Sequence, residues 1–246
     1  MKFRSFVGSV VLGIFVLVGL VACGGGGGGG GGGTTTNVSA NGLWEGTFTE
    51  SGAGTFDISG LLYNGRIIAI SESAGAIYDG SYTVSGSSIS GTVTAYQING
   101  GPFATATVSG SVTEQGSISL SFNTSYGTSG TMSLSFNSVY NRTSSLSLVA
   151  GNWNYTSGAY SLTITVQNDG SYWGQDSDGC VVSGTIGLLD TAHNLYNMNT
   201  SIASCGVLNG SYTGFSGLLD NVTTSDTLQV AVSNSNYILL YPFTRQ

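Results

Sequence analysis

Polar and apolar residues alternate along most of the chain after residue 42. The alternation is clearest in residues 117–122, Ser-Ile-Ser-Leu-Ser-Phe, and in residues 131–136, Thr-Met-Ser-Leu-Ser-Phe. Because successive side chains of a strand point to opposite faces, a period of two predicts strands with one buried face. No segment after residue 23 has a convincing helical period, so the sequence predicts an all-β fold.

Residue pairs that favour tight hairpin turns recur through the same region. They are Asn64-Gly65, Asp79-Gly80, Asn99-Gly100, Asp169-Gly170, Asp178-Gly179 and Asn209-Gly210. Asn, Asp and Gly tolerate the positive φ angles that such turns require. Turns spaced about ten residues apart predict consecutive antiparallel strands.

The strand region divides into two similar halves with eight candidate strands each. The first set is 43–50, 55–63, 66–73, 76–85, 88–98, 103–114, 117–124 and 130–140. The second set is 152–157, 160–167, 171–176, 180–189, 194–203, 206–218, 226–233 and 236–243. Eight meandering strands favour closure into a small barrel, since closure removes both sheet edges. We therefore predict two tandem antiparallel meander β-barrels, in residues 41–147 and 148–246, with residues 143–150 as the joint.

A short motif recurs at the two ends of each half. Gly42-x-Trp44 is matched by Arg142, and Gly151-x-Trp153 is matched by Arg245. This arrangement resembles lipocalins and other calycins, in which a Gly-x-Trp on the first strand packs beneath an arginine from the end of the last strand. The resemblance implies that each guanidinium lies on an indole and donates to backbone carbonyls, closing one end of its barrel.

Periodicity alone does not say which face of a strand is inside. An eight-stranded transmembrane barrel also alternates, with its apolar residues outward. The two successive small barrels, the Trp–Arg motifs and a lipid anchor favour barrels that do not span a membrane.

The chain begins with features of bacterial export. Lys2 and Arg4 precede an uncharged apolar run over residues 6–22, which is the layout of a secretory signal. At 17 residues the run is at the lower limit for a transmembrane helix. Residues 20–23, Leu-Val-Ala-Cys, resemble the lipobox of bacterial lipoproteins. The resemblance implies a signal peptide at residues 1–22, and a diacylglycerol thioether and an acyl chain on Cys23 as the only attached groups.

Ten glycines, residues 24–33, follow this cysteine. We predict that residues 23–40 form a flexible tether, which spans roughly 20–25 Å for a glycine-rich chain of this length. Glycine runs at this place resemble those of surface lipoproteins such as factor H-binding protein and transferrin-binding protein B. In lipoproteins an aspartate after the lipidated cysteine often directs retention in the inner membrane, so Gly24 favours the outer membrane. The sequence is compatible with either face of the outer membrane.

The charge of the mature chain excludes one class of partner. Without Lys2 and Arg4, the chain has three arginines, no lysine and twelve acidic residues, a net charge of −9. Binding to a phosphate backbone requires a basic surface, so we expect no nucleic-acid partner. An anionic membrane would also repel this chain, and membrane contact is expected through the lipid on Cys23.

Two cysteines, Cys180 and Cys205, remain after Cys23. In an exported protein such a pair predicts a disulfide. One precedes and the other follows a predicted hairpin, whose two ends are neighbours. Metal binding by the two thiols is the alternative.

Catalytic chemistry has little support in the sequence. His193 is the single histidine, and no serine is accompanied by a histidine or lysine cluster that would activate it. Asp169, Asp176 and Asp178 have part of the spacing of a calcium loop, but its later ligands are missing. We expect turn-forming roles for these aspartates, no metal site and no enzymatic activity.

Tyr172 and Trp173 are adjacent on a predicted strand, so their side chains face opposite ways. One is expected to fill the barrel. The other is a candidate contact for a protein or glycan partner, or else covers the joint between the barrels.

Three functions are compatible with these features. The leading hypothesis is a non-enzymatic binding module for a macromolecular partner, anchored at the outer membrane. The second is a carrier of a small apolar ligand inside a barrel, which large inward side chains would exclude and an open cavity would support. The third is a structural component of the envelope.

Overall fold

The computed structural model describes residues 36–98, 100–220 and 223–246. The predicted signal peptide, lipid attachment at Cys23 and glycine run lie outside these residues.

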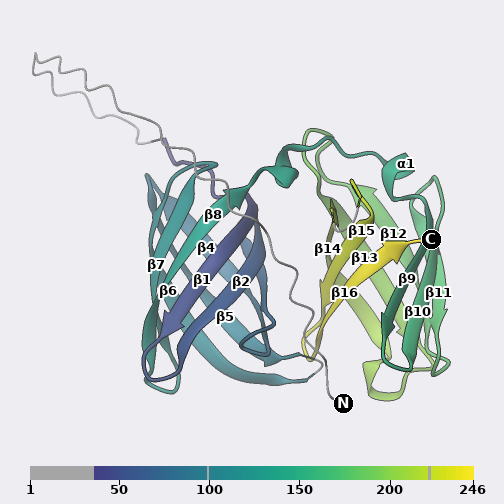
Figure 1. Cartoon of the computed structure of the whole chain (residues 1–246), viewed down its shortest axis with the longest axis horizontal. Helices are drawn as coiled ribbons and strands as arrows, with labels where there is room; N and C mark the ends of the chain where they lie inside the picture. Colours follow the sequence, from purple (N-terminus) through teal and green to yellow (C-terminus); the bar gives the residue numbers. More distant parts are fainter. Residues whose placement is uncertain (1–35, 99, 221–222) are drawn as a thin grey trace, which may run out of the picture. The chain divides into compact units, whose positions relative to one another are not determined.

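The first half of the chain is a closed barrel of eight antiparallel strands (Figure 1). Each strand pairs with the next, and the first pairs with the last over eight residue pairs, from Leu43 opposite Asn137 to Glu50 opposite Gly130. The strands are β1 (Gly42–Glu50), β2 (Gly54–Tyr63), β3 (Arg66–Ser71), β4 (Ala76–Ser85), β5 (Ser88–Gln97), β6 (Pro102–Val112), β7 (Ser117–Thr124) and β8 (Ser129–Asn137).

The second half is also a closed eight-stranded antiparallel barrel. Its strands are β9 (Gly151–Ser157), β10 (Tyr160–Val166), β11 (Ser171–Asp176), β12 (Val181–Leu188), β13 (Tyr196–Ala203), β14 (Gly210–Leu219), β15 (Thr227–Ser233) and β16 (Ile238–Arg245). Here β16 meets β9 at only two residue pairs, Thr244 opposite Asn154 and Arg245 opposite Trp153. The all-β class and the two tandem barrels predicted from the alternation are confirmed.

The apolar face of each strand points into its barrel. Trp44 and Ile118 are buried in the first core, and Trp153 and Leu228 are buried in the second. The intervening serines of β7 are exposed. In these strands the apolar positions that alternate with polar ones are on the inward face, which is the opposite of the arrangement in a transmembrane barrel. Among the described residues, no helix is long and apolar enough to cross a membrane.

Three single helical turns interrupt the predicted all-strand pattern. They are η1 (Ser138–Asn141), α1 (Leu146–Val149) and η2 (Gly206–Leu208). The strands predicted at 130–140 and 206–218 are therefore too long, and the expectation of no helix is wrong at these turns. At η1 the side chain of Asn137 accepts a hydrogen bond from the backbone N–H of Val139 and ends the strand. At η2 the side chain of Asn209 accepts from the backbone N–H of Cys205.

The segment before each barrel packs against one end of that barrel. Ala40 is buried, and its carbonyl accepts a hydrogen bond of 3.0 Å from the indole N–H of Trp44. Val149 is buried, and its carbonyl accepts the equivalent bond of 2.8 Å from Trp153. The predicted tether is thus too long at its C-terminal end, because residues 37–40 bind the first barrel. A buried indole N–H needs an acceptor, and the residue four positions earlier supplies it.

The two barrels contact one another through their outer faces. Ile68 and Ile77 of the first barrel form one buried apolar cluster with Ile238 of the second. Beside it, Arg66 forms an ion pair of 3.2 Å with Asp79 and donates a hydrogen bond of 2.8 Å to the hydroxyl of Ser233. The apolar outer positions of β3 and β4 are therefore explained by contact between the barrels.

The predicted disulfide between Cys180 and Cys205 is present, with the two Cα atoms 4.6 Å apart. It joins the ends of the β12–β13 hairpin, as the strand order requires.

Replacing both cysteines by serine is expected to lower the free energy of unfolding by about 3 kcal/mol, because the unfolded chain regains the entropy of an open loop. Urea denaturation monitored by circular dichroism measures this change. An unchanged midpoint would contradict it.

Candidate ligand-binding cavity

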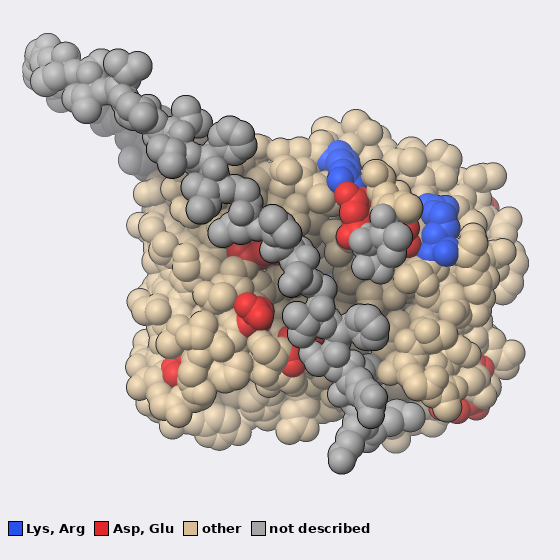
Figure 2. Space-filling view, in the orientation of Figure 1, with Lys and Arg blue, Asp and Glu red and all other residues tan. Residues whose placement is uncertain are grey.

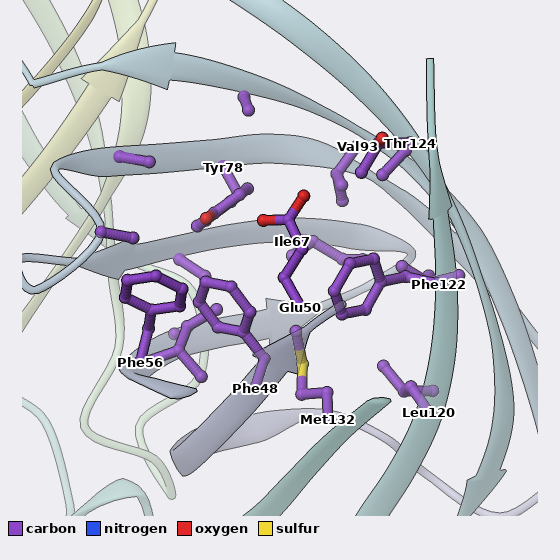
Figure 3. A pocket seen from close by; sticks show the side chains of 18 of the residues that line it. Phe48, Glu50, Phe56, Ile67, Tyr78, Val93, Leu120, Phe122, Thr124 and Met132 are labelled. Atoms are coloured by element: carbon purple, nitrogen blue, oxygen red, sulfur yellow. The ribbon is translucent and has the colours of Figure 1, made fainter. Parts of the chain in front are cut away.

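The interior of the first barrel contains a cavity of about 250 Å³ (Figure 3). All eight strands contribute side chains to its wall, and nearly all of these are apolar. Trp44 and Ile118 lie at one end of the lining, and Phe48 packs against Phe56 and Phe122 farther along, with ring centroids 5.2 and 6.0 Å apart. The wall is a surface suited to an apolar molecule.

The cavity exists because one layer of inward positions carries small residues. Consecutive strand pairings connect Gly60, Ala69, Tyr78, Ala95 and Ala104 across β2 to β6. All five residues line the cavity, and four of them are glycine or alanine. The period of the apolar positions predicts the strands but not the empty space inside them. Small residues at successive inward positions are the sequence feature that indicates the cavity.

The inward positions of the second barrel include large side chains. One cross-strand row there consists of Val166, Tyr172, Gly184, Thr200 and Tyr212. Both tyrosines are buried, and the hydroxyl of Tyr172 is 2.5 Å from that of Thr200. A Cβ atom on Gly184 would lie 1.9 Å from the backbone carbonyl oxygen of Asn199 and 2.8 Å from the hydroxyl of Tyr172, so both atoms exclude a larger residue there. The two barrels therefore share a fold but differ in their interiors.

The cavity reaches the surface near the β5–β6 and β7–β8 connections. Two of its lining residues there are exposed aromatics, Phe103 at 41% and Tyr126 at 71% of their surface. The hydroxyl of Tyr126 donates a hydrogen bond to the backbone carbonyl of Phe103, which ties the two connections together. We call Phe103, Tyr126 and the cavity entrance beside them the mouth.

One charged side chain, Glu50, lies among the residues that line the cavity. It ends β1 on the same inward face as Trp44 and Phe48, and its carboxylate points into the space between Tyr78 and Phe122 (Figure 3). Its Oε1 accepts a hydrogen bond of 2.5 Å from the hydroxyl of Thr128. Burial, and next the negative charge of Glu50, raise the pKa of Tyr78 to about 12. Tyr78 therefore stays a neutral phenol in the physiological range.

The structure treats the two predicted Trp–Arg pairs differently. The guanidinium of Arg245 lies 4.2 Å from the ring centroid of Trp153 and donates to the carbonyl of Ala150 at 3.1 Å. Arg142 instead donates to both carboxylate oxygens of Asp220, at 2.7 and 2.6 Å.

For the first barrel the predicted pairing of Arg142 with Trp44 is thus replaced by another contact. The indole of Trp44 meets the edge of Phe136, with ring centroids 5.5 Å apart. The helical turn η1 follows β8 and separates Arg142 from the barrel strand, whereas Arg245 is itself the last residue of β16. The position of an arginine after the last strand of a barrel therefore does not determine whether it stacks on the tryptophan of that barrel.

Acid is expected to weaken the Arg142–Asp220 contact. The hydrogen bond from Arg142, and next that from the backbone of Ser225, lower the pKa of Asp220 to about 2. A carboxylate with a lowered pKa in the fold contributes stability above its unfolded value of about 3.9, and this contribution is lost as the pH falls through about 2. Both side chains are more than one-third exposed, so salt will reduce the effect.

Urea unfolding between about pH 5 and pH 2 measures this contribution against Asp220→Asn, which keeps an oxygen acceptor but cannot ionise. The wild-type protein should lose more stability over this range than the variant. Equal losses would contradict the assignment.

Two of the three loop aspartates, Asp169 and Asp176, accept hydrogen bonds within their own turns. Asp169 accepts from the backbone N–H and hydroxyl of Ser171, and the hydrogen bonds lower the pKa of its carboxyl. Asp176 accepts from the backbone N–H groups of Asp178 and Cys180. A carboxylate oxygen of Asp176 also lies near the sulfurs of Cys180 and Cys205, but those sulfurs are joined in the disulfide. This arrangement provides turn stabilisation.

His193 lies outside the cavity. Its Nδ1 is 2.6 Å from a carboxylate oxygen of Asp190, and its ring stacks on Tyr140 with centroids 4.6 Å apart. Hydrogen bonds from the backbone of Ala192 and then from His193 lower the pKa of Asp190. The interaction orders the β12–β13 connection.

The adjacent aromatics of β11 do face opposite ways. Tyr172 is buried in the second barrel, and Trp173 is 53% exposed on its outer surface. Thr165 and Ser183, the cross-strand neighbours of Trp173, are uncharged. Charged side chains are sparse on the face of the molecule in Figure 2.

Comparisons with known proteins add little to these observations. No protein-family model matches the chain, and no curated protein matches it. The chain is similar to the crystal structure of a proposed outer membrane protein from Bacteroides fragilis NCTC 9343, with 14% sequence identity and a TM-score of 0.29. The similarity covers 84% of this chain and 97% of that chain. At this TM-score the likeness carries no argument, and the fold described above rests on the strand pairings of this chain.

Proposed function

We propose that the first barrel is a non-enzymatic binding site for a small apolar ligand, in a lipoprotein attached to the outer membrane through Cys23. The observation that carries this proposal is the apolar cavity inside the first barrel, whose wall includes side chains from all eight strands. The lipobox resemblance and the glycine run support the anchor. Such an anchor would hold the cavity close to a source of apolar molecules.

The size of the cavity limits the ligand. A dry apolar cavity of about 150 Å³ accommodates benzene, so one of about 250 Å³ has room for about ten non-hydrogen atoms. At roughly 0.6 kcal/mol per atom, within the range seen for small ligands, the affinity is on the order of tens of micromolar. The ligand class is therefore a short alkyl or single-ring compound.

Titration with octan-1-ol tests the proposal, because this alcohol is close to the expected size. The mature chain would carry Cys23→Ser, which removes the acceptor of the predicted lipid, so that no detergent competes for the cavity. We expect saturable binding at one site per chain by isothermal titration calorimetry. A titration without saturable heat would contradict the proposal.

Binding of a macromolecular partner is the second candidate, and the exposure of Trp173 favours it. Aromatic side chains of this kind are common anchors in protein interfaces. A partner outside the cell requires the barrels to face the cell exterior. Protease treatment of intact cells should then remove the barrels, whereas cleavage only after permeabilisation of the outer membrane would contradict surface display and leave ligand binding in the periplasm.

A further inference from the structure

The carboxylate of Glu50 is in an unusual environment for a charged group. Phe48, Phe122 and Met132 lie around it in the cavity (Figure 3). Its hydrogen bond comes from the neutral hydroxyl of Thr128. Within the part of the chain that the structure describes, Glu50 forms no ion pair. Partial burial removes water that would solvate the carboxylate, and no positively charged group replaces this lost solvation.

The position of Glu50 gives this carboxylate a role in choosing the ligand. It lies at the end of β1, opposite Gly130 of β8 and close to the β7–β8 connection that carries Tyr126 of the mouth. The apolar wall extends from there to Trp44 at the far end of the lining. A molecule that enters tail first would place its polar head beside Glu50 and its alkyl chain against the wall.

We propose that the cavity selects amphiphiles with a positively charged amine head, which Glu50 binds, over amphiphiles of the same length with a carboxylate head. This inference rests on the proposed function and specifies its ligand class. A protonated amine brings donors and a positive charge to the carboxylate, and charge-assisted hydrogen bonds are about twice as strong as neutral ones. A fatty acid would place a second negative charge beside the first.

Tyr78 also lines the cavity and could favour the opposite choice. Its neutral phenol is able to donate a hydrogen bond to an anionic head. Such a bond does not remove the repulsion from Glu50, since the phenol carries no charge. The selectivity therefore follows from Glu50, with the phenol as a secondary partner for a neutral alcohol head.

Three ligands of equal length separate this inference from the proposed function. Octan-1-ol, octylamine and octanoate would each be titrated at pH 7 into the Cys23→Ser chain. We expect octylamine to bind at least about tenfold tighter than octanoate, with octan-1-ol between them. Tight octan-1-ol binding with equal affinities for the amine and the acid would overturn the amine selectivity and leave the cavity function standing. Absence of binding by all three would overturn both.

Glu50→Gln and Glu45→Gln form a matched pair of variants. Both glutamates are on β1, but Glu45 is exposed on the outer face and accepts a hydrogen bond from Asn137. The preference for octylamine should fall to within about threefold in Glu50→Gln and remain in Glu45→Gln. The preference for octylamine could instead survive in Glu50→Gln or fall equally in both variants. Either result would assign the preference to the overall negative charge of the chain and overturn the proposal.

A measurement on the chain that keeps Glu50 tests the proposal even if the Glu50→Gln variant fails to fold. Attraction by exposed charges is screened over about 10 Å at 0.1 M salt, while partly buried pairs are screened much less. The ratio of octylamine to octanoate affinity should therefore persist between about 0.05 and 0.5 M sodium chloride. A ratio that approaches one at high salt would contradict a contact inside the cavity.

Discussion

Replacing Ala95 by leucine is expected to reduce octan-1-ol affinity by at least about tenfold. Ala95 is the central alanine of the row of small residues, and its methyl group faces the cavity from β5. The larger side chain would occupy volume that the ligand needs. The same side chain fills a void, so the free energy of unfolding should change by no more than about 1 kcal/mol.

Thr92→Leu is the matched control for this prediction. Thr92 is on the same strand but is exposed on the outer face. Its replacement should leave octan-1-ol affinity unchanged when both variants are measured by calorimetry under one set of conditions. Ala69→Leu, at the β3 position of the same row, should repeat the effect of Ala95→Leu. Full affinity in both alanine variants would place the ligand elsewhere.

Replacing Trp153 by alanine is expected to lower the free energy of unfolding by about 4 kcal/mol. The indole is fully buried, donates to the carbonyl of Val149 and is covered by the guanidinium of Arg245. Its removal would create a large void at the place where β9 and β16 meet through only two residue pairs. The loss of one polar partner also leaves the carbonyl of Val149 without its donor.

Trp173→Ala provides the control, because it removes the same side chain from the exposed face of the second barrel. Its effect on the free energy of unfolding should be within about 0.5 kcal/mol. Circular dichroism in urea suits both variants, since fluorescence would change with the loss of either indole. A loss below about 1 kcal/mol for Trp153→Ala would show that the barrel end is not held by this residue.

The fold could be predicted because its determinants are local in the sequence. Period-two alternation in residues 117–122 and turn pairs such as Asn64-Gly65 fix the strands and their order. The disulfide between Cys180 and Cys205 followed from the strand order, since a hairpin brings its own ends together. Features that depend on contacts between residues far apart in the sequence could not be predicted in this way.

The contact of Arg142 illustrates this limit. Arg142 finds Asp220, which is 78 positions away in the sequence. The acceptor for Trp44 is close in the sequence, at Ala40, but it lies in a segment that the alternation of polar and apolar residues does not assign to the barrel. The identity of an acceptor depends on the three-dimensional path of the chain, which residue patterns do not contain.

The cavity shows a different limit. Whether a barrel is hollow depends on the sum of side-chain volumes over all its inward positions, not on their period. Ala69 and Ala95 occur in segments that look like ordinary strands, and their partners across the barrel were not known. The sequence alone therefore favours binding of a macromolecular partner, whereas the cavity favours binding of a small apolar ligand as the function.

Methyl chemical shifts during an octan-1-ol titration test the central claim most directly. Selective labelling of alanine and methionine provides probes in both barrels of the Cys23→Ser chain. The methyls of Ala69, Ala95 and Met132, which line the cavity, should shift together and saturate. The methyl of Met198, buried in the second barrel, should stay in place. Shifts confined to Met198, or no saturable shift at Ala69 and Ala95, would contradict a ligand site in the first barrel.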